Sequence, residues 1–259
     1  MLPKRIFTAC LLLLTAATTQ VLATDIIAHR GYWKAEGAAQ NSRASLQNAI
    51  DLGCYGSEID IWLTTDGHLM VNHDASFQGV TIQDSTYDQC RNLTLENGEQ
   101  MPLLDDLLQM LKDSDSPTKL IIEIKEHATL LRNEAAASLT IKKVREYGLE
   151  DRVEYITFSH GAGLQVVKEA PDAKIAYLTG NIAPAVLKQE GFTGIDYERN
   201  VLLSHPEWIE EAHANGMTVN VWTPNKTNEF ARFIEMGVDY ITTDQPVEAL
   251  QTKQGKAAK

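Results

Sequence analysis

The sequence contains few residues of the kinds that mark unusual protein classes. Among 259 residues there are only 3 cysteines, 8 prolines and 16 glycines. These numbers exclude a disulfide scaffold, a collagen-like chain and a chain dominated by linkers. Basic residues are also scarce, with 23 lysines and arginines against 35 acids and a net charge of −12. A nucleic-acid surface needs a basic footprint, so we expect no nucleic-acid partner. An anionic substrate is not excluded, because a metal ion or a few placed cations reverse the sign locally.

Long apolar runs are absent except near the N-terminus. There, Lys4 and Arg5 precede a short apolar stretch around residues 11–14, and Ala23 ends a stretch of small residues. This order is typical of a secretory signal peptide, which we place at residues 1–23. The alternative is an uncleaved anchor, although the apolar run is short for a membrane span. We therefore expect a secreted or periplasmic protein with no stable membrane insertion after signal cleavage.

Two cysteines, Cys54 and Cys90, remain after the predicted cleavage. Export would permit a disulfide between them. Two cysteines carry no spacing signature, however, and no cysteine and histidine pattern indicates a zinc site. We predict two free or buried thiols.

The rest of the chain alternates between short apolar runs and helix-like segments, several of which end at a glycine. Such alternation predicts parallel strands joined by helical crossovers. Eight units predict a single (β/α)8 TIM barrel over residues 24–250, followed by a flexible tail at 251–259. The expected strands are Asp25–Ala28, Gly56–Trp62, Lys119–Lys125, Val153–Ser159, Lys174–Leu178, Gly194–Tyr197, Thr218–Trp222 and Tyr240–Thr242. The expected helices lie near 42–52, 103–112, 129–147, 161–170, 183–190, 205–215 and 226–236.

A ninth apolar run, Leu69–His73, follows Asp66-Gly67, which is a strong signal for a two-residue hairpin turn. We interpret residues 68–73 as a hairpin arm that folds back from the second strand and brings His73 opposite Asp60, at the barrel mouth. A parallel strand at this point would need a longer crossover. Residues 74–102 show no clear periodicity and form a small insertion. Such a loop is either a functional cap or a mobile surface segment.

Acidic residues recur on two of the expected strands. In Glu58-Ile59-Asp60 the side chains alternate, so both carboxylates point into the barrel. Glu123 takes the same position on the next strand. Buried carboxylates are costly unless they hold or pair with a cation. The three acids therefore predict a site for Ca²⁺ or Mg²⁺, which prefer oxygen ligands. The alternative is a buried ion-pair set, for example Lys125 with Glu58.

The first strand ends in His29-Arg30-Gly31, at the face where barrel enzymes carry their active sites. Arginine binds phosphate through its planar fork, and histidine moves protons near neutral pH. With His73 nearby, one histidine accepts a proton and the other protonates a leaving oxygen, which is what cleavage of a phosphodiester requires. Trp222 ends another strand and forms either an apolar wall of the site or part of the core.

These residues belong to a set of short motifs that resembles glycerophosphodiester phosphodiesterases. The motifs occur in the order of that family and extend over nearly all of the mature chain. They are His29-Arg30-Gly31, Gln40-Asn41-Ser42, Glu58-Ile59-Asp60, Thr65-Asp66-Gly67, His73-Asp74, Glu123-Ile124-Lys125, Val221-Trp222-Thr223 and Thr242-Thr243-Asp244.

The resemblance implies a (β/α)8 barrel with a hairpin and loop inserted after the second strand. It implies one divalent cation, Ca²⁺ or Mg²⁺, held by Glu58, Asp60 and Glu123. His29 and His73 would serve as general base and acid, and Arg30 and Lys125 would bind the phosphate. We add Asn41 and Trp222 to the substrate-binding residues.

The reaction implied by the resemblance turns a small-molecule glycerophosphodiester into glycerol 3-phosphate and an alcohol. A glycerol hydroxyl would attack first, and water would open the resulting cyclic phosphate.

The chain departs from the family pattern at two positions. Gln40 replaces a glutamate that the family usually carries, and Ala75-Ser76-Phe77-Gln78 replaces an Arg-Thr-Thr-like segment. Two alternatives therefore stand beside the hydrolase. One is a lyase that releases a cyclic phosphate, and the other, supported by Gln40, is a non-catalytic phosphodiester-binding protein.

Overall fold

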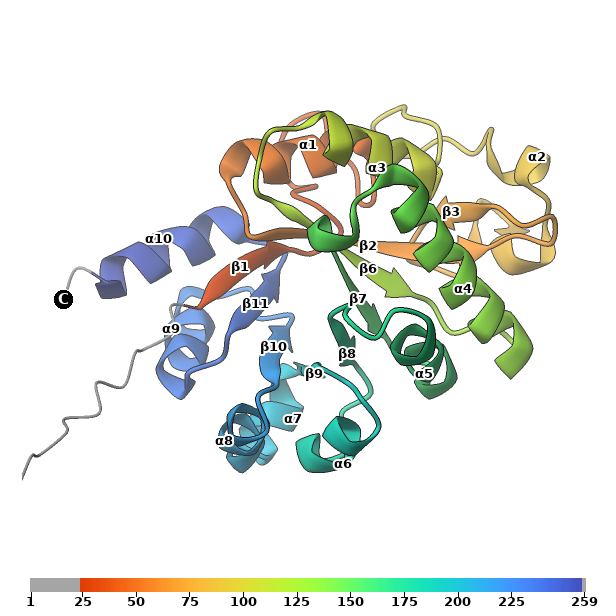
Figure 1. The fold of residues 1–259 in the computed structure, drawn as a ribbon. Helices are drawn as coiled ribbons and strands as arrows, with labels where there is room; N and C mark the ends of the chain where they lie inside the picture. The colour runs from red at the N-terminus through yellow and green to blue at the C-terminus, as the bar shows by residue number, and fades with distance from the viewer. Residues whose placement is uncertain (1–23, 258–259) are drawn as a thin grey trace, which may run out of the picture.

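The computed structural model describes residues 24–257 and contains a closed barrel of eight parallel strands (Figure 1). The strands follow one another around the barrel in chain order, and a pairing between the first two closes it. The fold predicted from the sequence is thereby confirmed. The barrel strands are β1 (Asp25–Ala28), β2 (Gly56–Leu63), β6 (Lys119–Ile124), β7 (Val153–Thr157), β8 (Ile175–Tyr177), β9 (Gly194–Glu198), β10 (Thr218–Trp222) and β11 (Tyr240–Thr243).

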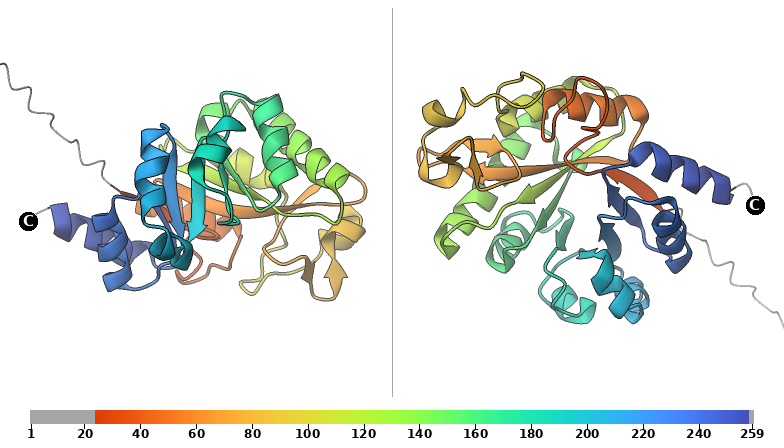
Figure 2. Two further views of the ribbon diagram at one scale, coloured as in Figure 1. Left: turned by 90° about the horizontal axis from the view of Figure 1, so that it is seen from below. Right: turned by 180° about the vertical axis from the view of Figure 1, so that it is seen from behind.

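Helices surround the strands in all three views (Figures 1 and 2). The helices are α1 (Arg43–Leu52), α3 (Leu104–Asp113), α4 (Leu130–Tyr147), α5 (His160–Glu169), α6 (Pro184–Gln189), α7 (Arg199–Ser204), α8 (Glu207–Ala214), α9 (Thr227–Met236) and α10 (Pro246–Ala257), with a 3₁₀ turn, η2 (Glu150–Arg152). Helix α1 illustrates the local signals, because Ser42 accepts a hydrogen bond from the Ser45 amide and Gly53 ends the helix in a left-handed conformation. Within residues 24–257, no helix combines the length and apolarity needed to cross a membrane.

Side-chain alternation divides each barrel strand into two faces. Ile59 and Ile61 of β2 join the large apolar core between strands and helices, whereas Glu58 and Asp60 point inward. A smaller apolar cluster fills the middle of the barrel, and it includes Ile27, Ile121, Ile156 and Leu178. The polar side chains above this cluster are therefore held at the carboxyl ends of the strands.

The hairpin arm predicted after β2 is present as β3 (Leu69–Val71), which pairs antiparallel with β2. The predicted register is wrong by one residue. The Thr64 amide donates to the His68 carbonyl at 2.9 Å, so the loop has three residues, 65–67, and not two. Gly67 supplies the left-handed conformation that such a loop needs, with φ of 83°. In consequence Asn72 lies opposite Asp60, with its amide 3.0 Å from the Asp60 carbonyl oxygen.

The insertion at residues 74–102 is a small cap that projects from one side of the barrel (Figures 1 and 2). It contains β4 (Ser76–Phe77), β5 (Val80–Thr81), η1 (Ile82–Asp84) and α2 (Tyr87–Cys90). It packs on β2 and β3 through a second apolar cluster, formed by Trp62, Met70, Ile82, Cys90 and Met101. Burial in this cluster favours the cap over the mobile surface segment. Cys54 and Cys90 are both free and buried, as predicted.

The C-terminal segment differs from the prediction of a flexible tail at 251–259. Helix α10 continues to Ala257, so residues 251–257 are helical. The helix is held to the barrel by the buried Ala249 and by Lys253, whose Nζ lies 2.6 Å from Asp25 Oδ1. Residues 258–259 and the predicted signal peptide at 1–23 lie outside the described residues. The first described residue, Thr24, donates its hydroxyl to the Val238 carbonyl at 2.7 Å.

Candidate active site at the barrel mouth

A pocket of about 190 Å³ opens at the carboxyl ends of the strands, where barrel enzymes hold their active sites. Most of the residues singled out from the sequence line it. The lining residues are His29, Arg30, Glu58, His73, Glu123, Ile156, Phe158, Leu178, Asp196, Trp222, Thr223 and Thr242. Asp60, Lys125 and Asn41 lie behind the walls and contact the residues that line the pocket.

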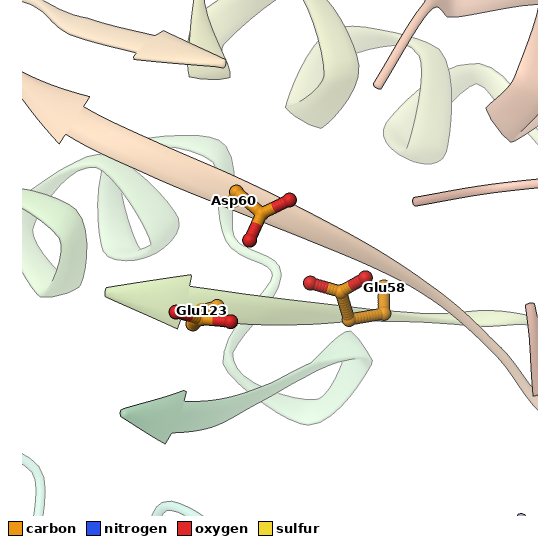
Figure 3. Close-up of side chains that lie close together, drawn as sticks. All are labelled: Glu58, Asp60 and Glu123. Carbon is orange, nitrogen blue, oxygen red and sulfur yellow. The ribbon is translucent and has the colours of Figure 1, made fainter. Parts of the chain in front are cut away.

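Three carboxylates lie close together on two neighbouring strands (Figure 3). Glu58 and Asp60 come from β2 and Glu123 from β6, where Asp60 and Glu123 are register partners. One oxygen of each acid lies within 4.8 Å of the others, and all three side chains are buried. Strand alternation and parallel pairing thus bring together the three acids predicted from the sequence.

Burial and mutual repulsion disfavour ionisation of two of these acids. Burial, with the charges of Asp60 and Glu123, raises the pKa of Glu58 well above its ordinary value. Burial and the charge of Asp60 raise the pKa of Glu123 to about 7. Burial also opposes ionisation of Asp60, yet the neighbouring Lys125 and His73 outweigh it and lower the pKa of Asp60. The cluster therefore lacks enough positive charge in the chain to compensate all three carboxylates.

The alternative, a buried ion-pair set, is present in part: Lys125 pairs with Asp60 and Glu123, but not with Glu58, the partner given as the example. Lys125 Nζ lies 3.2 Å from Asp60 Oδ1 and 2.8 Å from Glu123 Oε1. Glu58 Oε2 accepts a hydrogen bond from the Arg30 amide at 2.7 Å, but Glu58 Oε1 is buried with no partner among the described residues. An orphaned carboxylate oxygen beside two further carboxylates fits a hard divalent cation, since the whole donor set is oxygen.

The two histidines are each held by a carboxylate. His29 Nδ1 donates to Asp244 Oδ1 at 2.8 Å, which leaves its Nε2 available to the pocket. Burial alone would raise the pKa of Asp244, but hydrogen bonds from His29, Asn225 and Trp33 lower it to about 2. On the hairpin side, His73 Nδ1 donates to Asp74 at 2.7 Å, and burial lowers the pKa of His73.

Arg30 enters the pocket from a strained turn. Its backbone is left-handed, with φ of 56°, and its guanidinium NH1 donates to Gln40 Oε1 at 2.5 Å. The next residue, Gly31, also has a positive φ, and a Cβ there would lie 2.3 Å from Ser45 Oγ. Glycine is therefore required at position 31 for β1 and α1 to approach each other and set the Arg30 turn.

Asn41 has a different task from the substrate contact predicted for it. Its Nδ2 donates to Asp60 Oδ2 at 2.8 Å, and its Oδ1 accepts the Asp60 amide at 3.2 Å. The side chain is buried and does not line the pocket. Asn41 thus positions Asp60 instead of facing the substrate.

The opposite side of the pocket was largely missed from the sequence. Phe158 and Leu178 form an apolar wall with Trp222, which lies at the mouth, and the floor holds Asp196 and Thr242. Trp222 packs edge-to-face on Phe158, with ring centroids 5.8 Å apart. Asp196 carried a usable signal, because it alternates with apolar residues along β9 just as Glu58 does along β2.

Comparison with known proteins agrees with this arrangement. Residues 29–248 match the glycerophosphoryl diester phosphodiesterase family. A glycerophosphodiester phosphodiesterase of Caldanaerobacter subterraneus subsp. tengcongensis is 30% identical over 241 residues, which cover 87% of this chain and 96% of that protein. One from Bacillus altitudinis is 26% identical over 248 residues, which cover 89% and 98%. A crystal structure of a glycerophosphodiester phosphodiesterase from Parabacteroides distasonis is 44% identical, with a TM-score of 0.89 and coverage of 91% and 98%.

Proposed function

The chain belongs to the glycerophosphoryl diester phosphodiesterase family, and we propose that it hydrolyses glycerophosphodiesters with a divalent cation and two histidines. The observation that carries the proposal is a cluster of three buried carboxylates, two of which line one small pocket together with two histidines and Arg30. The products would be glycerol 3-phosphate and an alcohol.

Glu58, Asp60 and Glu123 would hold the cation, which we propose to be Ca²⁺ or Mg²⁺ because every available donor is a carboxylate oxygen. When bound, such a cation polarises a phosphoryl oxygen and stabilises the charge that develops in the transition state. Arg30 lines the pocket, and its guanidinium would bind the phosphate and stabilise the same developing charge. Lys125, which now lies between Asp60 and Glu123, adds a second positive charge beside them.

The two histidines divide the proton transfers. We assign His29 as the general base, because the Asp244 carboxylate fixes its tautomer with Nε2 free to accept a proton. His73 lines the same pocket from the hairpin after β2 and protonates the leaving alcohol oxygen as its bond to phosphorus breaks. The attacking glycerol hydroxyl gives its proton to His29 as its oxygen bonds to phosphorus, which leaves a cyclic phosphate with His29 protonated and His73 deprotonated. Water then adds to phosphorus and gives a proton to His73, while His29 protonates the ring oxygen that leaves, so glycerol 3-phosphate forms and both histidines return to their starting states.

The direct test is release of glycerol 3-phosphate from a panel of glycerophosphodiesters in the presence of Ca²⁺, Mg²⁺ or EDTA. We expect release that depends on the cation and is lost in His29→Ala and His73→Ala, with both variants folded. Phosphorus NMR should show an open monoester as the final product, whereas a cyclic ester would favour the lyase. No release by folded, cation-loaded protein would disprove the hydrolase, and unaltered retention of the diester would favour the binding protein.

A substrate series tests the division between the histidines. A diester of p-nitrophenol needs little protonation of its leaving group, so His73→Ala should lose much less activity on it than on an alkyl diester. His29→Ala should lose similar activity on both. If His29→Ala instead lost much less activity on the p-nitrophenol diester, His29 would be the general acid and His73 the general base.

We further propose that the enzyme acts outside the cytoplasm, on the strength of the signal-like residues 1–23. The first described residue, Thr24, packs near the amino ends of the barrel strands, at the end opposite the pocket. Cell fractionation with mass spectrometry of the mature N-terminus tests this, and we expect a chain that begins at Thr24.

A further inference from the structure

One buried acid in the pocket has no task in the proposed mechanism. Asp196, on β9, is 1% exposed and lines the pocket floor. Its Oδ2 accepts a hydrogen bond from Asn220 Nδ2 at 2.9 Å, and the same nitrogen lies 2.9 Å from Thr242 Oγ1. Its Oδ1 is buried and has no partner among the described residues. A buried polar atom without a partner destabilises the folded chain, so it is retained where it serves a ligand or a water.

The location of Asp196 indicates which part of a substrate it meets. Around the closed barrel, β9 lies across from β2, which carries Glu58 and Asp60. A phosphate bound near Arg30 and the acids would therefore extend the rest of the molecule over the floor toward Asp196. The pocket, at about 190 Å³, is smaller than the roughly 300–1,000 Å³ of sites for larger ligands. The floor accordingly suits the short glycerol unit, and the variable alcohol would point out of the mouth.

The chemistry of the carboxyl group agrees with a hydroxyl ligand. Burial, together with the negative charge of Glu123, raises the pKa of Asp196 to about 8. The group is therefore mostly protonated at neutral pH. Since Oδ2 accepts from Asn220, the proton belongs on Oδ1, which can donate it to an alcohol oxygen. An uncharged donor in this position avoids repelling the phosphate.

We propose that Asp196, held by Asn220 and flanked by Thr242, binds the terminal hydroxyl of the glycerol unit and determines selectivity for glycerol diesters. The inference rests on the proposed function and deepens it, because it names the part of the substrate that the floor recognises. Asp196 acts in specificity here and takes no part in proton transfer.

The test compares two diesters that carry the same alcohol. One is the glycerol diester, and the other is its propane-1,2-diol analogue, which keeps the attacking hydroxyl and lacks the terminal one. Asp196→Ala should lower kcat/KM for the glycerol diester by roughly 10–100-fold, the range of one or two lost hydrogen bonds. The same variant should change kcat/KM for the analogue by less than about threefold, on the same reasoning.

Two further variants make the result specific. Asp196→Asn keeps an uncharged donor at the position of Oδ1 and should retain the wild-type preference. Glu154→Gln alters an inward-facing acid at the other end of the barrel, near Lys174, and should leave both rates unchanged. Equal losses on both diesters with Asp196→Ala, or no loss on either, would overturn the inference. A buried water in the cavity of about 20 Å³ beneath the floor would then be the partner of Asp196.

Failure of the proposed function gives a different result. Wild-type protein that cleaves neither diester with Ca²⁺ or Mg²⁺ would disprove the hydrolase without testing Asp196. Calorimetric titration with glycerol 3-phosphate and with propane-1,2-diol 1-phosphate tests the proposed role of Asp196 without requiring turnover. We expect the wild type to bind the glycerol compound roughly tenfold more tightly, and Asp196→Ala to bind both equally. Equal binding of both by the wild type would contradict the inference.

Discussion

At the scale of single residues, His29 depends on one carboxylate for its orientation. Asp244 is the last residue of a motif recognised in the sequence, and it accepts hydrogen bonds from His29, Trp33 and Asn225. A carboxylate in this role fixes the imidazole tautomer and stabilises the imidazolium that forms during the reaction. We therefore expect Asp244 to act on catalysis indirectly, through His29, and its effect to be separable from folding.

We predict that Asp244→Asn lowers kcat by about 10³–10⁴-fold, because the amide no longer selects the tautomer with Nε2 free. The protein should stay folded, as checked by circular dichroism and thermal unfolding. Glu207→Gln provides the matched control, since Glu207 makes the same contact with the exposed His205 at 3.0 Å. A kcat that stays within about tenfold of wild type would remove Asp244 from the mechanism.

The raised pKa of Asp196 also leads to a prediction about how the free energy of unfolding depends on pH. Its pKa in the folded state, about 8, lies above the ordinary value of 3.8. Below pH 4 both folded and unfolded chains hold the proton, and between pH 4 and pH 8 mainly the unfolded chain releases it. Wild-type stability from this group therefore falls as pH rises through that window, with a slope of at most about 1.4 kcal/mol per pH unit.

The asparagine in Asp196→Asn cannot titrate. The free energy of unfolding of this variant, relative to that of wild type, should therefore increase as pH rises from 4 to 8. Urea unfolding at several pH values, with EDTA present, measures the difference. Asp172→Asn, at an exposed position, controls for the removal of one carboxylate. A difference between Asp196→Asn and wild type that does not change with pH would show that Asp196 is ionised in the folded chain.

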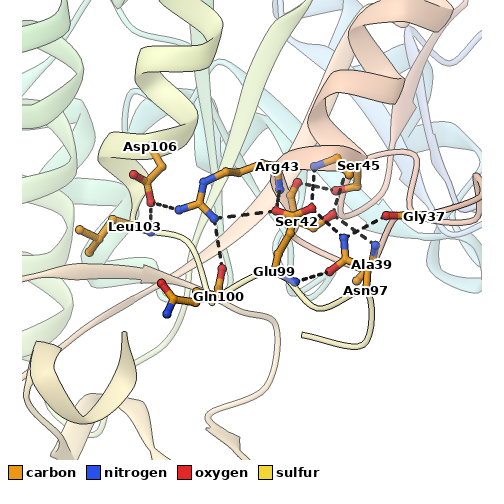
Figure 4. A network of polar contacts seen from close by, with 11 residues as sticks. Gly37, Ala39, Ser42, Arg43, Ser45, Asn97, Glu99, Gln100, Leu103 and Asp106 are labelled. Carbon is orange, nitrogen blue, oxygen red and sulfur yellow. Dashed lines mark hydrogen bonds and ion pairs between the residues drawn. The ribbon is translucent and has the colours of Figure 1, made fainter. Parts of the chain in front are cut away.

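At the scale of elements, the cap and the loop between β1 and α1 form one unit (Figure 4). Glu99, at the end of the insertion, accepts the amides of Arg43 and Ala44 at 2.9 and 3.1 Å and so caps α1. Asn97 donates to the Gly37 carbonyl at 3.1 Å. The loop secured in this way carries Asn41, which holds the predicted metal ligand Asp60.

We predict that Glu99→Ala lowers the free energy of unfolding by about 1 kcal/mol, the usual cost of a lost helix cap. Loosening of the loop should also weaken cation binding by up to about tenfold, the lower end of effects transmitted through ligand-supporting residues. Urea unfolding and calorimetric titration measure the two effects. Glu96→Ala, at an exposed position on the same segment, should show neither. If the Glu99→Ala variant were destabilised but bound the cation with unchanged affinity, the contact between the insertion and α1 would have only a structural role.

The elements that could be predicted from the sequence are those with regular periodicity. Side chains of a strand alternate between its two faces, and this two-residue period correctly predicted that Glu58 and Asp60 point into the barrel. The eight alternating strand and helix segments correctly predicted that the sheet closes. The hairpin register failed because loop length depends on the left-handed conformation of Gly67, which composition does not reveal. Helix α7 was missed because it has only 6 residues and begins directly after β9, at Arg199, where the side chain of Glu198 caps it.

Contacts between distant segments account for the other errors at the site. His127 belongs to no sequence motif that would place it, yet it is 4% exposed and accepts the Leu63 amide at 2.9 Å. Asn41 reaches Asp60 across 19 positions in the chain. Such pairs are created by the packing of β1, β2 and β6 and leave no local trace.

At the scale of the whole molecule, an acidic protein must bind an anion. The net charge is −12, and the described part of the chain supplies only Arg30 and Lys125 as permanent cations at the acidic site. Without a cation the three acids are either protonated or negatively charged and offer a phosphate diester no positive charge, whereas a divalent cation changes the sign of the local field. We therefore expect substrate binding to depend on the cation.

Cation binding should therefore depend on pH in a defined direction. Burial, with the charge of Asp60, raises the pKa of Glu123 to about 7, and the pKa of Glu58 is raised as well. A cation must displace the protons that these groups hold, so its affinity should rise as pH increases from 6 to 8.

With cation at 100 times its dissociation constant, stabilisation is about 2.7 kcal/mol, or roughly 5–10 °C in Tm for a protein of this size. We expect a larger Tm shift with Ca²⁺ or Mg²⁺ at pH 8 than at pH 6, and none in Glu58→Gln. Calorimetry in buffers of different ionisation enthalpy should detect proton release on binding near pH 7. Equal affinity at pH 6 and pH 8 would mean that Glu58 and Glu123 are already ionised before the cation binds. Lys125 and Arg30 would then neutralise the acids more completely than their distances indicate.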